Sequence, residues 1–194
     1  GIGREVVLGL LRAGSRVAAL DLSTEGLAAT VAEAEAEGSA AMLTTHPVDV
    51  TQRDAVSTLP EQVVAAHGAV DGLVNVAGII QPFVTVDALT PEQIEKVMNV
   101  NFWGVLNTCQ AFLPHLKAAG EGHVVNISSL FGLLAVPSQS AYNAAKFAVR
   151  GFTGIGLVTL LYLAVNAAFL FAFGREGLAG LCVEQDELSV HALG

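Results

Sequence analysis

Short apolar segments alternate with longer segments of helical periodicity through the first 153 residues of the chain. Strands are predicted at 16–21, 41–45, 72–76 and 123–127. Helices are predicted at 4–13, 24–37, 51–67 and 90–119, each followed by a glycine that can end it: Gly14, Gly38, Gly68 and Gly120. This alternation favours the α/β class of folds.

The composition narrows the class of protein further. At 194 residues the chain has the length of one domain, and its hydrophobic content of 53% argues against disorder. The net charge of −9 argues against a nucleic-acid partner, whose phosphates need Lys and Arg. Cys109 and Cys182 form no CxxC motif, and the five histidines have no metal-ligand spacing, so no metal site is expected. Residues 1–20 lack the pattern of a signal peptide, so we expect a cytoplasmic protein.

The segment from Asn126 to Phe147 holds three side chains suited to proton transfer: Ser129, Tyr142 and Lys146. Tyr142 and Lys146 are four residues apart, which places them one turn from each other on a helix. A phenol ordinarily has a pKa of about 10, and a neighbouring ammonium lowers that pKa by favouring the phenolate. The Ser129 hydroxyl could hydrogen-bond a substrate oxygen whose charge changes. The Tyr-Lys spacing alone is a weak signal, because it also occurs on any exposed helix face.

A glycine turn opens the chain as Gly1-Ile2-Gly3 and leads into the first predicted helix. Such a turn at a helix N-terminus can hold a pyrophosphate, because the backbone approaches closely and free N–H groups point at the anion. Alone this signal is weak as well, since many chains begin with glycine.

An acidic residue, Asp21, ends the predicted strand at 16–21. In dinucleotide-binding folds a carboxylate here hydrogen-bonds the ribose hydroxyls and repels a 2′-phosphate. Asp21 therefore favours NAD over NADP. It could instead cap the next helix, although Ser23 already suits that role, and Arg4 could still assist a phosphate.

Capping signals mark the start of two helices. Thr51 with Asp54 is typical of a capping box for the helix that ends at 67, and Thr90 with Gln93 is typical of one for the helix at 90–119. Asn101 falls in the middle of the latter helix, where asparagine is a mediocre helix former and could simply be a surface residue. Three acids of the helix at 24–37 are interpreted as a solvated face: Glu33, Glu35 and Glu37.

Five motifs occur in order: GIG at 1–3, NVAG at 75–78, VNFWG at 100–104, NISS at 126–129 and AYNAAK at 141–146. With a serine 13 residues before the tyrosine, the chain resembles the short-chain dehydrogenase/reductase family over about residues 1–153. The resemblance implies a doubly wound, Rossmann-like parallel sheet. The family's T-G-x-x-x-G-x-G pattern follows a first strand at the centre of the sheet. Gly1 and Gly3 match its last two glycines, so the first strand of the family would be missing here. The resemblance also ends near residue 153, and we therefore expect a fold that is incomplete at both ends.

The resemblance also implies a reaction, the NAD(P)-dependent interconversion of a secondary alcohol and a carbonyl compound. Tyr142 would remove the hydroxyl proton, and Ser129 would hydrogen-bond the reacting oxygen. Lys146 would lower the pKa of the tyrosine and bind the nicotinamide ribose. Asn101 would distort its helix locally and anchor a water that relays protons.

The implied cofactor is NAD, with NADP less favoured. The residues implied to contact it are Gly1, Ile2, Gly3, Asp21, Asp49, Val50, Asn75, Ala77, Gly78, Tyr142 and Lys146. Asp49 and Val50 would lie at the adenine, and Asn75 would also join neighbouring strands through its side chain. The family usually has NNAG where this chain has NVAG. The helices near 90–119 and 142–155 would pair with those of a second subunit in a homodimer or homotetramer.

The resemblance ends near residue 153, so the chain divides into a catalytic domain at 1–153 and an atypical apolar tail at 154–194. Residues 151–174 carry no charge, and glycines at 151, 154 and 156 weaken helix continuity. A shifted reading frame, a diverged but folded C-terminus, and a membrane anchor each explain this tail.

Three functions stay open at this point: an active oxidoreductase, an inactive cofactor-binding or interaction protein, and a membrane-tethered reductase. A membrane partner is the least favoured, because the helix of Tyr142 would run straight into the apolar segment.

Overall fold

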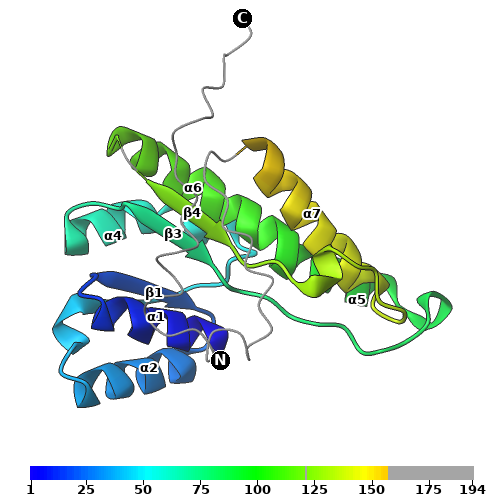
Figure 1. Cartoon of the computed structure of the whole chain (residues 1–194), viewed down its shortest axis with the longest axis horizontal. Helices are drawn as coiled ribbons and strands as arrows, with labels where there is room; N and C mark the ends of the chain where they lie inside the picture. The colour runs from blue at the N-terminus through cyan, green and yellow to red at the C-terminus, as the bar shows by residue number, and fades with distance from the viewer. Residues whose placement is uncertain (121, 157–194) are drawn as a thin grey trace, which may run out of the picture.

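The computed structural model describes residues 1–120 and 122–156 (Figure 1). Its strands are β1 (Val17–Asp21), β2 (Leu43–Pro47), β3 (Gly72–Asn75) and β4 (His123–Asn126). They form two parallel pairs, in which Val17 lies opposite Leu43 and Gly72 lies opposite His123. Within the described residues no ladder joins one pair to the other. The described strands thus form two separate parallel pairs, β1 with β2 and β3 with β4.

Helices connect and cover the strands. They are α1 (Ile2–Arg12), α2 (Thr24–Ala36), α3 (Arg53–Ser57), α4 (Leu59–His67), α5 (Pro91–Met98), α6 (Gly104–Ala118) and α7 (Ser140–Gly156). A π-helical segment, η3 (Asn99–Trp103), joins α5 to α6, and three single 3₁₀ turns are η1 (Ala40–Met42), η2 (Val86–Ala88) and η4 (Leu130–Gly132).

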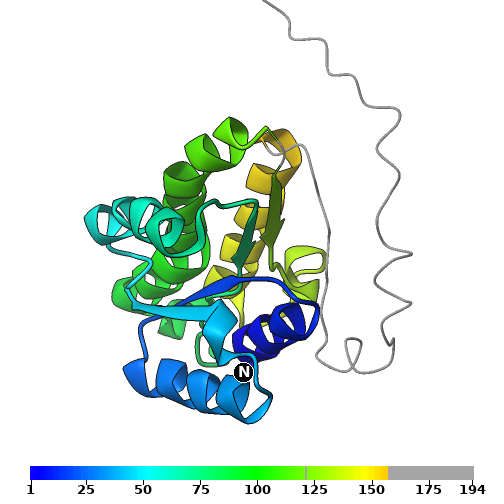
Figure 2. The same cartoon turned by 90° about the vertical axis from the view of Figure 1, so that its left-hand side faces the viewer.

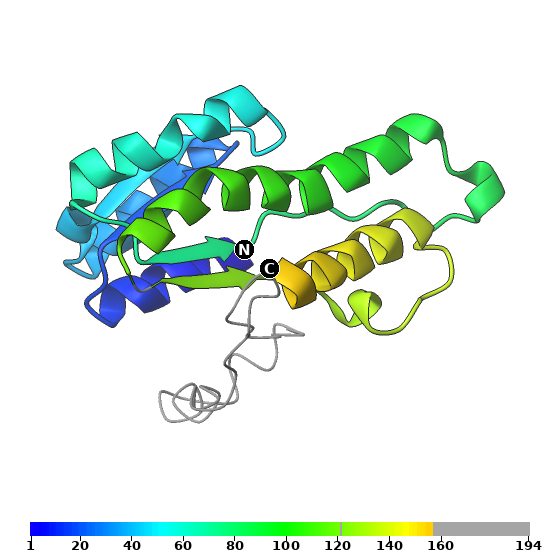
Figure 3. The same cartoon turned by 90° about the horizontal axis from the view of Figure 1, so that it is seen from above.

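Two apolar clusters lie on the two faces of the strands, as the alternation of side chains along a strand requires. On one face Val17 packs with Leu8 and Leu11 of α1 and Ala34 of α2. On the other face Ala18 and Leu20 pack against a larger cluster contributed by α3, α4, α6, β4 and α7. Figure 2 shows α1 and α2 on one side of the β1–β2 pair and α4 and α6 on the other, and Figure 3 shows α1 and α6 on opposite sides of the strands. The predicted α/β fold with helices on both faces is confirmed.

Several local predictions are confirmed as well. The glycines that follow the first four predicted helices all adopt the left-handed conformation, with φ of +86°, +72°, +90° and +81°, which other residues rarely adopt. Thr90 and Gln93 form the predicted capping box, with both hydrogen bonds present. Ser23 caps α2 by accepting the N–H of Gly26 at 2.9 Å.

The helix predicted at 51–67 is wrong in two respects. It is divided into α3 and α4, and Pro60 occupies the second position of α4, where its missing N–H costs no hydrogen bond. The capping box of Thr51 with Asp54 does not form, because both the N–H and the hydroxyl of Thr51 donate to Asp49. The strand predicted at 41–45 also begins later, at Leu43, after the turn η1.

The last described helix, α7, agrees closely with the helix predicted near 142–155. Helix α7 continues through Gly151 and Gly154 to Gly156 and therefore crosses the predicted boundary at 153/154. Most of the predicted apolar tail, from 157 to 194, lies outside the described residues. Of the helices that the structure describes, none has the length and apolar character needed to cross a membrane.

Candidate functional site

The predicted site residues gather where the strands end. Both strand pairs are parallel, so their carboxyl ends lie at the edge where open α/β sheets bind ligands. Asp21 ends β1, Asp49 follows β2, and Asn75 ends β3. Ser129 follows β4 by three residues. The fold therefore carries the predicted residues from four strands to one edge.

Asn75 joins the two strands of its pair, as predicted. Its amide Nδ2 donates to Oδ1 of Asn126 on β4 at 2.8 Å, and its Oδ1 accepts the hydroxyl of Thr108 at 2.7 Å. Asn126 in turn donates to Thr153 of α7 at 3.1 Å. A buried chain of neutral hydrogen bonds thus runs from α6 through β3 and β4 to α7, although the sequence analysis singled out only Asn75.

Asn101 is fully buried at 0% exposure, so the surface interpretation of this residue is wrong. It lies in the π-helical segment η3, which is the local helix distortion that the resemblance implied. Its Nδ2 donates to the carbonyls of Val97 at 2.9 Å and Ile79 at 2.8 Å, and its Oδ1 accepts the N–H of Ile79 at 3.2 Å. These bonds fix the side chain against the loop that follows β3.

Gly78 leaves room for this arrangement. A Cβ added at Gly78 would lie 2.8 Å from Oδ1 of Asn101 and 3.6 Å from Nζ of Lys146. An added Cβ would therefore clash with Asn101 and come into ordinary contact with Lys146. The same atoms show that Asn101 and Lys146 approach each other around Gly78, although they come from η3 and α7.

Lys146 is the buried charge of the site. It is 3% exposed, and its ammonium donates to the carbonyl of Ile127 at 3.0 Å. Burial lowers the pKa of Lys146 from 10.5 to about 8, because the charged form loses its hydration. Within 1–120 and 122–156, no carboxylate lies close enough to form an ion pair with it. The ring centroid of Tyr142, one turn earlier on α7, lies 5.7 Å from its Nζ.

Ser129 is held near α7 by contacts of its neighbours Ser128 and Phe131. Its Oγ accepts the N–H of Phe131 at 3.2 Å, and the ring of Phe131 meets that of Tyr142 edge to face at 5.8 Å. Ser128 donates from its hydroxyl to the carbonyl of Lys146 at 3.1 Å. The segment after β4 and helix α7 therefore hold Ser129, Tyr142 and Lys146 in one neighbourhood.

Gly132 belongs to the same contact and was missed by the sequence analysis. A Cβ there would lie 2.5 Å from the Ser128 hydroxyl and 2.9 Å from the Lys146 carbonyl. Only glycine allows this approach of η4 to α7. No motif spacing marks it.

The first three residues place a glycine turn at the N-terminus of α1. A Cβ added at Gly1 would meet no protein atom within 4 Å, whereas one at Gly3 would touch Val76 just beyond β3 at 3.9 Å. Among the described residues, nothing packs closely against position 1, and its contact with a pyrophosphate stays a prediction. The valine of NVAG thus lies against this turn.

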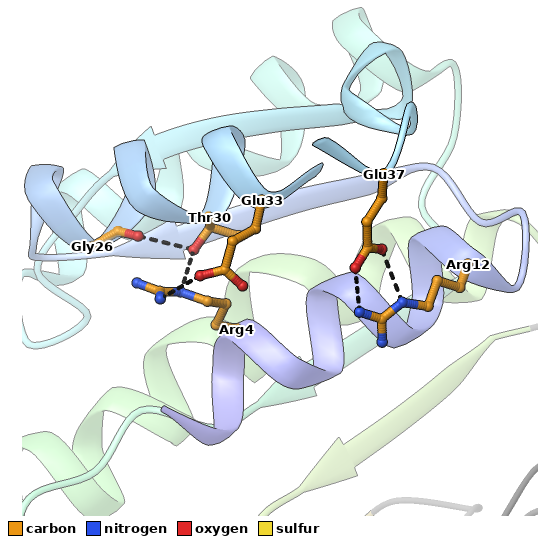
Figure 4. Close-up of polar contacts among 6 residues, drawn as sticks. All are labelled: Arg4, Arg12, Gly26, Thr30, Glu33 and Glu37. Carbon is orange, nitrogen blue, oxygen red and sulfur yellow. Dashed lines mark hydrogen bonds and ion pairs between the residues drawn. The ribbon is translucent and has the colours of Figure 1, made fainter. Parts of the chain in front are cut away.

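Asp21 and Arg4 differ in how far their charges are engaged. Asp21 is exposed, and one of its carboxylate oxygens accepts the N–H of Ser23 at 2.8 Å. Arg4 donates to the Thr30 hydroxyl at 3.3 Å and forms an ion pair with Glu33 at 2.7 Å (Figure 4). The cation expected to assist a phosphate is thus held by α2, and Glu33 is paired rather than merely solvated.

Asp49 and Val50 are positioned by α6 and by their own loop. Asp49 accepts both hydrogen bonds of Thr51 at 2.9 and 2.8 Å. The carbonyl of Val50 accepts Nδ2 of Asn107 at 3.0 Å, and a Cβ on Gly104 would lie 2.7 Å from a methyl of Val50. The pair is thus fixed beside β2, and its contact with adenine stays a prediction.

Parallel strands covered by helices on both faces, with a glycine turn and the polar residues at the strand ends, define an α/β protein of the Rossmann-like class. A family model described as short chain dehydrogenase matches residues 1–165. The chain belongs to the short-chain dehydrogenase family, and the match extends beyond the 153 residues of the resemblance.

A protein of Mycobacterium tuberculosis (strain H37Rv), named "Putative oxidoreductase SadH", is 51% identical over 153 residues, which are 79% of this chain and 54% of that protein. A metagenomic short-chain oxidoreductase in complex with NADP superimposes with a TM-score of 0.74 at 32% identity, over 79% of this chain and 69% of that one. A gluconate 5-dehydrogenase from Burkholderia cenocepacia, in complex with NADP and tartrate, gives 0.72 at 35% identity, over 79% and 59%. The chain spans about half the length of the first of these relatives.

Proposed function

We propose that residues 1–153 form the cofactor-binding and catalytic part of an NAD(P)-dependent oxidoreductase that interconverts a secondary alcohol and a carbonyl compound. One observation carries this proposal: Lys146 is a buried cation whose neighbours are Asn101, Gly78 and the ring of Tyr142. Burying a charge without a counter-ion costs free energy, so such a residue points to a function rather than to stability.

The residues at the strand ends suit a nicotinamide dinucleotide. The turn Gly1-Ile2-Gly3 would hold its pyrophosphate at the N-terminus of α1, and Asp49 with Val50 would lie at the adenine. Asn75, Ala77 and Gly78 would let the backbone approach the ring end of the cofactor. When bound, the nicotinamide accepts or supplies the hydride.

NAD is the preferred cofactor of this proposal. Asp21 is exposed at the end of β1, where its charge would repel a 2′-phosphate. Arg4, the cation that could have balanced such a phosphate, is held by Thr30 and Glu33. The two solved neighbours described above carry NADP, so this chain would differ from them in the second phosphate.

In the oxidation direction, Tyr142 accepts the proton of the substrate hydroxyl and Ser129 donates a hydrogen bond to the reacting oxygen. The Lys146 ammonium favours the negative charge that Tyr142 must carry, and it would bind the nicotinamide ribose. Asn101 holds the loop after β3 through Ile79 and would anchor the proton-relaying water. In the reduction direction each proton moves the other way.

The proposal includes a homodimer or homotetramer. Trp103 of η3 is 48% exposed and Phe147 of α7 is 40% exposed. Large exposed apolar side chains on neighbouring helices suit a protein interface.

The proposal also places the protein in the cytoplasm. Cys109 is a buried free thiol, which suits that reducing compartment.

The competing proposal is a protein that binds the cofactor without turnover. Replacement of Tyr142 by phenylalanine separates the two, because it removes one oxygen and little else. We expect Tyr142→Phe to abolish the formation of NADH from NAD and a panel of secondary alcohols, while NADH still binds, as measured by its fluorescence. Full turnover by Tyr142→Phe would contradict the mechanism.

A further inference from the structure

Gln81 lies in the loop between β3 and α5, is only 3% exposed, and hydrogen-bonds through every polar atom of its side chain. Its Oε1 accepts the backbone N–H of Ala141 at 2.9 Å and of Tyr142 at 3.1 Å. Its Nε2 donates to the carbonyl of Ser138 at 3.3 Å. Gln139 donates from its own amide to the backbone carbonyl of Gln81 at 3.1 Å.

These bonds make Gln81 the cap of helix α7. The first N–H groups of a helix have no partner within the helix and need one from outside. In α7, two of them donate to a side chain that lies about 60 residues earlier in the chain. The residue capped at 3.1 Å is Tyr142 itself. The loop after β3 therefore fixes the turn that carries the tyrosine.

The same loop holds a second residue of the site. Ile79, two residues before Gln81, exchanges two hydrogen bonds with Asn101, at 3.2 Å through its N–H and 2.8 Å through its carbonyl. A short segment from 78 to 81 thus contacts Asn101 at one end and the first turn of α7 at the other. Neither contact belongs to a recognisable sequence motif.

We propose that Gln81 is a positioning residue that holds Tyr142 in place relative to Lys146 and Asn101 by capping the first turn of α7. The inference rests on the proposed function, in which Tyr142 accepts the proton of the substrate hydroxyl. Without the cap, the first turn frays and Tyr142 moves. Lys146 lies one turn further into the helix and keeps its bond to Ile127, so the distance between the two side chains changes.

Two matched substitutions test this role in the full chain. Gln81→Met keeps the length of the side chain and removes the cap of α7. Gln93→Met is the control in α5: it removes the hydrogen bond that Gln93 Oε1 accepts from the N–H of Thr90 at 3.0 Å, while the Thr90 hydroxyl still caps the helix. Helix α5 carries none of the proposed catalytic side chains, so only the first substitution should disturb the reaction.

We expect Gln81→Met to lower kcat by about 100-fold, the scale of a small misplacement of a reacting group. The affinity for NADH should change less than about twofold, since most of the proposed cofactor contacts lie on other elements and Lys146 keeps its bond to Ile127. Amide exchange should accelerate at Ala141 and Tyr142. Gln93→Met should leave kcat unchanged. Gln81→Glu keeps an acceptor oxygen for the N–H groups of Ala141 and Tyr142 but loses the donor to the Ser138 carbonyl, so it should recover part of the lost kcat.

Parental kcat in Gln81→Met would overturn the proposal, as would an equal loss of kcat in Gln93→Met. Unchanged amide exchange at Ala141 and Tyr142 would also overturn it. Tyr142→Phe in the same assay separates this failure from that of the proposed function. If Tyr142→Phe is inactive while Gln81→Met is fully active, the role of Gln81 alone is wrong. If Tyr142→Phe is active, the proposed function is wrong, and the role of Gln81 with it.

Discussion

The two parts of the described chain are held together by different interactions. In the first, residues 1–70, helices α1 and α2 are joined at the surface by charged pairs, Arg4 with Glu33 and Arg12 with Glu37 (Figure 4). In the second, residues 71–156, buried neutral side chains hydrogen-bond one another from α6 to α7. Exposed ion pairs contribute little to stability, whereas a buried polar group that loses its partner is costly.

This difference matches the demands of the proposed chemistry. In the proposed function, a dinucleotide would be bound largely by backbone groups and by one exposed carboxylate, which tolerate small movements of α2. Proton transfer requires Asn101, Ser129, Tyr142 and Lys146 to keep fixed relative positions. The second part provides that rigidity with uncharged hydrogen bonds, so that Lys146 is its one buried charge among the described residues.

The largest effect is expected from Gly78→Ala. Its Cβ would lie 2.8 Å from Oδ1 of Asn101, so Asn101 or the loop must move. We expect a loss of about 1–3 kcal/mol in the free energy of unfolding and a fall in turnover of about 100-fold. Denaturant titration and steady-state kinetics measure the two effects.

The matched control is Gly9→Ala in α1, where a Cβ meets no atom within 4 Å. Alanine is the better helix former, so this change should raise the free energy of unfolding by about 1 kcal/mol. A loss of stability of the same size in Gly9→Ala would show that the close contact with Asn101 is not what makes Gly78→Ala costly.

Thr108→Val should come next. It keeps the shape of the side chain but leaves Oδ1 of Asn75 without the hydroxyl that donates to it at 2.7 Å. The expected loss is about 1–3 kcal/mol, unchanged between low and high salt, because the bond is buried and uncharged. A loss that disappears in 1 M NaCl would contradict this interpretation.

The lowered pKa of Lys146 should make the free energy of unfolding depend on pH. Its pKa of about 8 in the folded protein lies below its ordinary value of 10.5. The unfolded chain therefore binds more protons in this range, and the free energy of unfolding rises with pH, by about 1 kcal/mol between pH 8 and 9. Burial raises the pKa of Cys109 from 9.0 to about 11, which opposes the rise above pH 9. Lys146→Met should remove the rise, and its persistence would assign it to another group.

The smallest effect is expected from Arg12→Gln in the first part. The hydrogen bond to Glu37 raises the pKa of Arg12 and lowers that of Glu37, but both groups are exposed. Solvent screens such a pair, so thermal unfolding should shift only slightly, and the shift should vanish at high salt. If Arg12→Gln lowered stability more than Thr108→Val, the exposed ion pair would contribute more than the buried hydrogen bond, contrary to this account.

The features predicted correctly from the sequence are local ones. Gly14 and Gly38 end helices because only a few residues around them decide the conformation. The capping box of Thr90 with Gln93 also involves neighbours in the chain. The family motifs placed Lys146 and Asn101 near each other, and both do lie beside Gly78, while their roles in a reaction stay a prediction.

The features that were missed depend on contacts between distant segments. Gln81 caps a helix about 60 residues later, and nothing near it in the sequence marks it as buried. Thr51 was predicted to cap a helix, but Asp49 bonds it instead. Such choices among several polar partners are decided by the folded arrangement, which no local pattern contains.

The most direct test of the account is the pKa of Lys146, because the proposed chemistry depends on this buried cation. The chain has three lysines, Lys96, Lys117 and Lys146, so NMR of carbon-labelled lysine side chains can follow each one, with Lys146→Met to assign the signal. The account predicts a titration near pH 8 for Lys146. An ordinary value near 10.5 would show that Lys146 is hydrated. It would then not be the buried partner of Asn101 and Tyr142.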